Sequence, residues 1–253
     1  SLVSTIISHD LRVPLKLLEG YTDLLLGGSL GVLTESQAKF LQRIKANTER
    51  MRHTMNNLSL LISLDSGTVG IEATEVNLSS LIDRVVSQSK AQAEEKQIHL
   101  RANVPSALPP IRADSLKLEQ VLNNLLDNAL KCSPPRSEVI IAAEIHREDD
   151  REHHMPALFV AVSTEDAGGG IGPEHRAKVF DRPEQPERYP ISGLGDRGIG
   201  LVVAKGLVEA HGGKIWLESK MGVGTKIVFA LPAQPGAAYV RNGVAANRGV
   251  QVS

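Results

Sequence analysis

Two neighbouring side chains near the start of the chain, His9 and Asp10, belong to residue types that carry nucleophilic chemistry. A carboxylate that accepts one imidazole proton leaves the other ring nitrogen free to attack an electrophile. His9 is two residues from both Ile7 and Leu11, roughly 200° around an α-helix from each, so we expect it to point away from an apolar seam and to be exposed. The alternative is an inert surface histidine beside an aspartate, and the pair alone does not decide between the two.

A second polar group recurs at helical spacing in residues 124–131. Asn124, Asn128 and Lys131 fall at positions i, i+4 and i+7, so they share one helix face. Amide oxygens can hold a magnesium ion that keeps most of its ligands as water and phosphate, and a nearby lysine can neutralise phosphate charge. An ordinary amphipathic helix with a polar stripe is the alternative, and this feature alone leaves both open.

Two glycine-rich loops follow. Asp166 comes just after an expected strand and precedes Gly168 and Gly170. Glycines there let the backbone approach a flat ligand, and an aspartate can accept a hydrogen bond from an exocyclic amine such as that of adenine. Gly198 and Gly200 open an expected helix that continues to about residue 210, where free N–H groups and the positive end of the helix dipole favour phosphate.

The elements that must position these residues follow from the hydrophobic period. Apolar residues in segments 2–26 and 41–62 recur at alternating steps of three and four, which predicts two helices joined by a short loop. A lone helical hairpin leaves part of each apolar stripe in water, and two hairpins that form a four-helix bundle would bury it. We therefore predict a homodimer. The period stops at residues 65–70, where we expect the linker between two domains.

The second half of the chain predicts a mixed α+β domain, a sheet covered on one face by helices. Residues 98–104, 139–145 and 158–164 alternate like strands. Asn77 and Asp114 are expected to cap helices that run to about Lys96 and Lys131. Residues 146–154 suggest a solvated hairpin loop rather than a metal site. Residues 172–196 suggest either a mobile lid over a nucleotide or a variable surface loop.

Composition excludes several classes of protein. The 253 residues carry 28 basic and 29 acidic side chains and 3% aromatic residues, so neither a basic surplus nor a stacking platform for nucleic acid is present. Cys132 is the single cysteine, which excludes an intrachain disulfide framework and a cysteine-based zinc site. No apolar run approaches the length of a membrane span, so we expect no membrane contact in this segment. The chain starts without methionine, and we expect a fragment of a longer protein.

Taken together and in this order, the segments resemble the catalytic core of sensor histidine kinases of bacterial two-component systems. Residues 8–15 resemble the family's phosphoacceptor box, and residues 122–131 its asparagine box. Residues 166–170 and 198–201 resemble its two glycine boxes, and residues 209–219 and 222–225 complete the match. The resemblance covers roughly residues 4–232.

The resemblance implies a dimeric helical hairpin followed by an α+β sandwich that binds ATP, of the type shared with gyrase and the Hsp90 chaperones. It implies that His9 is the nucleophile and Asp10 its acid/base partner. It further implies ligands for ATP and Mg²⁺: Asn128 for the metal with Asn124 beside it, Lys131 for phosphate, Asp166 for the adenine amine, Gly168 and Gly170 for the shape of that pocket, Gly198 and Gly200 for phosphate, and Thr225 near the adenine. The phosphoryl group would pass from ATP to His9 and then to an aspartate of a response regulator receiver domain.

Four positions depart from the family pattern. Val13 stands where members that dephosphorylate their regulator carry threonine or asparagine, and it cannot hydrogen-bond water, so we predict weak or absent phosphatase activity. Pro183 and Cys132 replace usual aromatic residues in the lid and after the asparagine box. Arg197 places a cation by the phosphates, either as an ATP ligand or as a solvated lid residue. Val13, Pro183 and Cys132 together motivate an alternative function, a degraded dimeric signalling scaffold with little or no catalysis.

A gyrase-like ATPase fits less well, because those relatives place a water-activating glutamate where Asn124 stands. The expected organisation is a dimerisation and phosphotransfer hairpin at residues 1–66, a linker at 67–75, an ATP-binding domain at 76–232 and a disordered tail at 233–253. We expect a cytoplasmic location for this segment, with any membrane anchor upstream of it.

Overall fold

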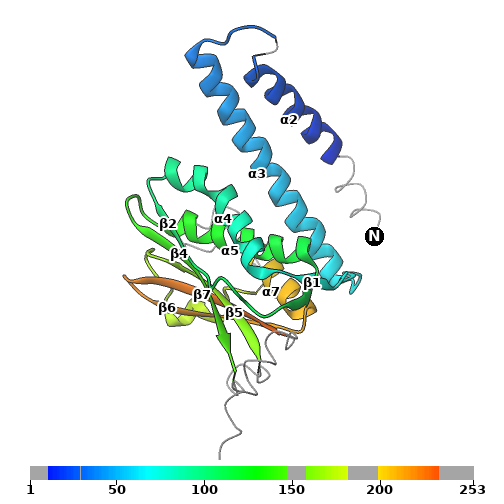
Figure 1. The fold of residues 1–253 in the computed structure, drawn as a ribbon. Coiled ribbons are helices and arrows are strands. Elements are labelled where there is room, and N and C mark those ends of the chain that lie inside the picture. The colour runs from blue at the N-terminus through cyan, green and yellow to red at the C-terminus, as the bar shows by residue number, and fades with distance from the viewer. Residues whose placement is uncertain (1–10, 29, 148–157, 182–198, 234–253) are drawn as a thin grey trace, which may run out of the picture. The chain divides into compact units, whose positions relative to one another are not determined.

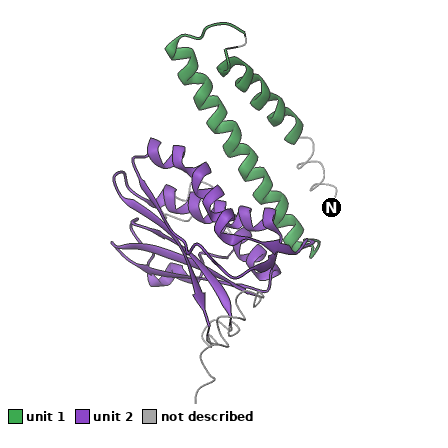
Figure 2. Ribbon diagram, viewed as in Figure 1, with its two compact units in different colours: residues 1–69 green, residues 70–253 purple. Residues whose placement is uncertain are grey.

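The computed structural model describes residues 11–28, 30–147, 158–181 and 199–233. The chain divides into two compact units, residues Ser1–Val69 and Gly70–Ser253 (Figure 2). Each unit is described by itself below. Among the described residues, none of the helices has both the length and the apolar character that spanning a lipid bilayer requires.

The first unit is an antiparallel helical hairpin of α2 (Arg12–Leu26) and α3 (Glu35–Asp65). Thr34 begins α3 with a capping box, in which its hydroxyl accepts the Gln37 N–H and the Gln37 side chain accepts the Thr34 N–H. Two ion pairs join the helices: Lys45 Nζ lies 2.6 Å from Asp23 Oδ1, and Arg52 Nε lies 2.9 Å from Glu19 Oε1. The predicted helical hairpin is therefore confirmed.

The hairpin buries few of its side chains. The buried residues on its two helices are Leu15, Thr22, Thr48 and Asn57. A set of large apolar side chains on the same helices stays exposed: Val13, Leu17, Leu18, Tyr21, Leu24, Phe40, Ile44 and Met51. An amphipathic helix gains most of its stability by burying its apolar face, so within this unit a large part of that gain is not realised.

The second unit is an α/β sandwich. Its helices are α4 (Leu78–Glu95), α5 (Ser115–Cys132), the short α6 (Pro173–Arg176) and α7 (Ile199–Ala210). A five-stranded sheet has the order β2-β4-β5-β7-β6, with β2 (His99–Asn103), β4 (Glu138–His146), β5 (Phe159–Asp166), β7 (Gly224–Pro232) and β6 (Lys214–Lys220). The β2–β4 pair is parallel and the other pairs are antiparallel. Helices α4, α5 and α7 cover one face of this sheet (Figure 1), as the sequence predicts.

The core lies between these helices and the sheet. Helix α5 buries Leu118, Leu122 and Leu125 completely, and the central strands contribute fully buried side chains such as Val162 and Phe229. Apolar residues three and four apart on α5 point to the same side, so the whole stripe meets the sheet. The opposite face of α5 is left free to carry its polar residues.

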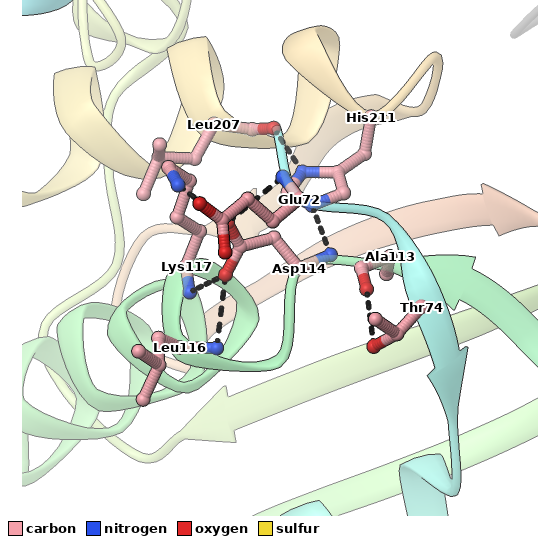
Figure 3. A network of polar contacts seen from close by, with 8 residues as sticks. All are labelled: Glu72, Thr74, Ala113, Asp114, Leu116, Lys117, Leu207 and His211. Carbon is pink, nitrogen blue, oxygen red and sulfur yellow. Dashed lines mark hydrogen bonds and ion pairs between the residues drawn. The ribbon is translucent and has the colours of Figure 1, made fainter. Parts of the chain in front are cut away.

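A smaller sheet pairs β1 (Thr74–Val76) antiparallel with β3 (Ile111–Ala113). Thr74 and Glu75 fall in the segment expected to be linker, and the structure places them in this strand within the second unit. Beside it, the predicted cap Asp114 begins α5: its Oδ1 accepts the backbone N–H groups of Leu116 (3.1 Å) and Lys117 (3.2 Å). Its other oxygen, Oδ2, pairs with the Lys117 ammonium and accepts the Glu72 N–H at 3.3 Å (Figure 3).

His211 joins the end of α7 to this cap (Figure 3). Its Nε2 accepts the Asp114 backbone N–H at 3.0 Å, and its Nδ1 donates to the Leu207 carbonyl at 2.7 Å. Burial tends to raise the pKa of Asp114, but the hydrogen bonds from Lys117 and Glu72 outweigh it and hold that pKa below its ordinary value of 3.8. This network therefore fixes the start of α5 relative to the end of α7.

Parts of three predicted segments lie outside the described residues. Of the expected lid at 172–196, residues 172–181 are described and contain α6. Of the expected loop at 146–154, His146 is the last residue of β4, and its ring stacks on Phe159 at 4.6 Å between centroids. Of the tail at 233–253, only Ala233 is described.

Candidate nucleotide site

Eight of the twelve sequence-predicted site residues lie in the described part of the second unit: Asn124, Asn128, Lys131, Asp166, Gly168, Gly170, Gly200 and Thr225. They belong to α5, the end of β5 and its following loop, the start of α7 and the start of β7. His9, Asp10, Arg197 and Gly198 lie outside the described residues.

Asp166 is a buried carboxylate at the last position of β5, with 6% of its surface exposed. Its Oδ1 accepts the Gly168 N–H at 2.8 Å. Burial raises the pKa of Asp166 above its ordinary value of 3.8, although hydrogen bonds from the backbone N–H groups of Gly168 and Thr225 act in the opposite direction. A buried carboxylate that accepts hydrogen bonds from two backbone N–H groups retains capacity to accept a further N–H bond.

Only glycine fits at position 168, in the loop that follows Asp166. A methyl group at its Cα would lie 2.8 Å from Asp166 Oδ1 and 2.8 Å from the Cys132 carbonyl oxygen, closer than a carbon can approach either atom. The same contact shows that the end of α5 and the loop after β5 meet at Gly168. The structure thus brings together the asparagine-bearing helix and the aspartate loop, two segments far apart in the sequence.

Gly170 has φ +72°, in the left-handed region that glycine adopts without strain, and a side chain there would overlap the Lys220 carbonyl. The loop is held against the turn between β6 and β7, because the Gly222 N–H donates to the Gly169 carbonyl at 2.8 Å. Thr225, 5% exposed, pairs directly with Asp166 in the β5–β7 register. The three predicted residues Asp166, Gly170 and Thr225 therefore lie at one end of the sheet.

Ser219 connects these elements and is not among the sequence-predicted site residues. Its hydroxyl accepts the Ile171 N–H at 2.8 Å, donates to the Gly224 carbonyl at 2.9 Å and lies 2.9 Å from Thr225 Oγ1. In the sequence, the feature that could have indicated Ser219 is its position at the end of the segment 209–219, just before the glycines of 222–225. It acts on the loop from a neighbouring strand, which a linear motif does not reveal.

The polar face of α5 carries the other predicted residues. Asn124 is 3% exposed and its Oδ1 accepts a hydrogen bond from Gln120 at 3.2 Å. Gly200, in the first turn of α7, packs on it: a methyl group at Gly200 would lie 3.5 Å from the Asn124 amide carbon. Asn128 and Lys131 follow on the same face, both half-buried. This places the start of α7 directly beside the Asn124 side chain.

Cys132 borders the aspartate loop through its carbonyl at Gly168. Burial, and next the negative charge of Asp166, raise the pKa of its thiol to about 11. A thiol with that pKa is protonated at neutral pH, so Cys132 behaves as a small apolar side chain.

Together these groups have the chemistry that an adenine nucleotide requires. A buried carboxylate can accept the exocyclic amine of a base, and glycine backbone can lie flat against it. The asparagine face and the first turn of α7 offer amide oxygens, a lysine and N–H groups of the kinds that bind magnesium and phosphate. The close contact at Gly168 places the loop after Asp166 beside the end of α5, the helix that carries Asn124 and Asn128.

Comparison with known families agrees with both units. Residues 1–67 match the His Kinase A (phospho-acceptor) domain, and residues 113–235 match the histidine kinase-, DNA gyrase B- and HSP90-like ATPase family. The chain belongs to the sensor histidine kinase family. The predicted resemblance is thereby confirmed.

Curated sensor histidine kinases are similar in sequence to this chain over most of its length. It is similar to the sensor histidine kinase WalK of Bacillus subtilis, with 30% identity over 226 residues, 89% of this chain and 35% of the relative. It is also similar to the circadian input-output histidine kinase CikA of Synechococcus elongatus, with 32% identity over 229 residues, 90% of this chain and 29% of the relative. The kinase core therefore spans about a third of the length of these relatives.

Solved structures agree on the fold. Full-length ShkA, determined in complex with AMPPNP, superimposes with a TM-score of 0.67 at 25% identity over 93% of this chain and 47% of its own. The Acinetobacter baumannii histidine kinase AdeS gives a TM-score of 0.58 at 18% identity over 89% of this chain and 98% of its own, a likeness of fold alone. None of these comparisons supports the alternative of a degraded scaffold.

Proposed function

We propose that this kinase core transfers the γ-phosphoryl group of ATP to His9 and then to an aspartate on the receiver domain of a response regulator. The observation that carries the proposal is the close contact at Gly168 between the loop after the buried Asp166 and the end of α5, the helix that carries Asn124 and Asn128, in a chain whose first unit matches a phosphoacceptor domain. The structure of ShkA with AMPPNP supports ATP as the nucleotide.

In this proposal each site residue has one task. Asp166 accepts the adenine amine, Gly168 and Gly170 leave room for the base, and Thr225 lies near it. Lys131, Arg197, Gly198 and Gly200 hold phosphate. Asn128 holds Mg²⁺ with Asn124 beside it, and the metal, when bound, neutralises phosphate charge as the bond to the leaving group breaks.

The transfer step is an in-line displacement. A nitrogen of His9 forms a bond to the γ-phosphorus while the bond from that phosphorus to the bridging oxygen breaks, and ADP leaves with the electron pair. Asp10 accepts the proton that the other imidazole nitrogen carries. Water is a poor acceptor here because the position where relatives place a base to activate it is Asn124. Val13, 52% exposed and without a hydrogen-bonding group, is consistent with weak phosphatase activity.

The proposed assembly is a homodimer through the hairpin. The exposed apolar side chains of α2 and α3 would be buried by a second copy in a four-helix bundle. The hairpin at residues 1–66 would also receive the response regulator, with residues 67–75 as linker and 76–232 as the ATP-binding domain. We place the reaction in the cytoplasm, where ATP and receiver domains are available.

Incubation with γ-labelled ATP and magnesium tests the proposal, with His9→Gln as the matched variant. An acid-labile, alkali-stable label that is lost in the variant supports phosphohistidine at that position. Label that persists in His9→Gln, or no label despite saturable ATP binding and folded protein, contradicts it.

A further inference from the structure

Lys131 already has an anionic partner on its own helix. Its Nζ lies 2.6 Å from Asp127 Oδ2, one helical turn earlier, and the two side chains are 22% and 26% exposed. An ammonium that is paired with a carboxylate is not equally available to a phosphate, because both anions compete for the same charge and the same donors.

Asp127 is itself held from a neighbouring helix. Gln92 on α4 donates from Nε2 to Asp127 Oδ1 at 3.1 Å. Four residues later, the ammonium of Lys96, the residue that follows the end of α4, donates to the Leu130 carbonyl at 3.1 Å. Both oxygens of the Asp127 carboxylate are therefore engaged, one by Gln92 and one by Lys131, and its position is fixed by α4 as well as by α5.

Around the axis of α5, Lys131 lies between the Asp127 carboxylate and the face that carries Asn124 and Asn128. At 100° per residue, Lys131 lies about 20° to one side of Asn124, and Asp127 lies about 40° further in the same direction, toward α4. Asn128 lies on the other side of Asn124. A small swing of the lysine therefore carries its ammonium from the Asp127 carboxylate to the asparagine face.

We propose that Asp127, held by Gln92, is a positioning residue that keeps the Lys131 ammonium on the α4 side of the helix until a nucleotide phosphate draws it away. This rests on the proposed role of Lys131 in phosphate binding. Asp127 then weakens binding of the phosphates and leaves binding of the base unchanged. It acts through Lys131 alone, so its effect requires that lysine.

The test compares ATP with adenosine, which has no phosphate. Dissociation constants are measured by calorimetry for the full 253-residue chain in EDTA, so that magnesium does not contribute, for wild type, Asp127→Asn, Lys131→Met and the double variant. Asp127→Asn is expected to tighten ATP binding about fivefold, the equivalent of a partly exposed ion pair of about 1 kcal/mol, with adenosine unchanged. Lys131→Met is expected to weaken ATP binding, and the double variant to match Lys131→Met.

Glu119→Gln is the matched control. Glu119 pairs with Arg84 across the same two helices at 2.9 Å, and this substitution should leave both affinities unchanged. Asp127→Ser, which also removes the charge, replaces Asp127→Asn if the latter fails to fold in a thermal unfolding check.

The phosphate role of Lys131 and the positioning role of Asp127 can fail separately. Unchanged ATP binding in Lys131→Met removes the proposed phosphate role of that lysine. If Lys131→Met weakens ATP binding as expected, three results overturn the positioning role: ATP binding unchanged by loss of the Asp127 charge, ATP binding equally tightened when Lys131 is absent, or adenosine binding changed as much as ATP binding.

Discussion

Among single residues, the Asp166 carboxylate matters most for the proposed binding of the adenine base. Its pKa is raised in the free protein, so the folded state binds a proton more readily than the unfolded chain, and the folded state loses stability as pH rises from 3.8 through the raised value. A base amine that donates to the carboxylate favours its charged form.

Adenosine binding should therefore tighten as pH rises through the raised pKa and then level off. Asp166→Asn should weaken binding about tenfold or more, the worth of a hydrogen bond to a charged group, and should remove this pH dependence. Titration calorimetry at several pH values checks both. Equal pH dependence in the two proteins would mean that another group governs it.

Gly168 offers a sharper test of the same site, because its neighbour Gly169 is a natural control. A methyl group at Gly168 would collide with Asp166 and with the end of α5, whereas one at Gly169 would meet nothing within 4 Å. Gly168→Ala should weaken adenosine binding about tenfold, the usual scale of overpacking, and Gly169→Ala should leave it unchanged. Equal effects of the two substitutions would contradict the close contact.

Cys132 should react slowly with alkylating reagents. With the pKa of the thiol at about 11, the reactive thiolate is scarce, so iodoacetamide at pH 8 should modify it about a hundredfold more slowly than a free cysteine. Mass spectrometry over time gives the rate. Modification at the rate of free cysteine would show that the thiol is neither buried nor next to Asp166.

At the scale of elements, the Asp114–His211 network holds α5 and α7 in place. Asp114→Ala removes a helix cap and should lower the free energy of unfolding by about 1–2 kcal/mol, measured by urea denaturation, whereas Asp83→Ala on the exposed face of α4 should change it little. Because the pKa of Asp114 is lowered, its contribution is present above pH 3.8 and is lost as pH falls below that value. Equal losses in both variants would argue against the network.

The elements also mark what the sequence predicts well. Helix caps and an apolar period are local signals in the sequence. The helices that begin after Asn77 and Asp114 were therefore predicted closely. The strand β1 was not predicted, because three residues carry no period and its partner β3 lies far along the chain. The contacts of Asp127 with Gln92 and of Asp114 with His211 join residues 35 and 97 positions apart. Only the fold brings such pairs together, so no linear pattern reveals them.

For the whole molecule, the exposed apolar side chains of α2 and α3 predict a dimer. Light scattering should give twice the chain mass of 27.2 kDa. Tyr21→Glu, at a 61% exposed position on α2, should shift this toward monomer, and Val32→Glu, in the loop and fully exposed, should not. ATP affinity should stay unchanged in both, because the residues proposed to bind the nucleotide belong to the second unit. A monomeric wild-type chain would contradict the predicted dimer.

The proposed reaction involves both units, because a nucleotide held at Asp166 would phosphorylate His9. The most direct measurement is tandem mass spectrometry of the full chain after incubation with magnesium and ATP, under alkaline conditions that preserve phosphohistidine. The expected result is a phosphoryl group on His9 in the wild type and, at an ATP concentration well below the wild-type dissociation constant, an initial rate about tenfold or more lower in Asp166→Asn that is still folded by circular dichroism. Phosphorylation at another residue, or phosphorylation of His9 that is undiminished in folded Asp166→Asn, would contradict it.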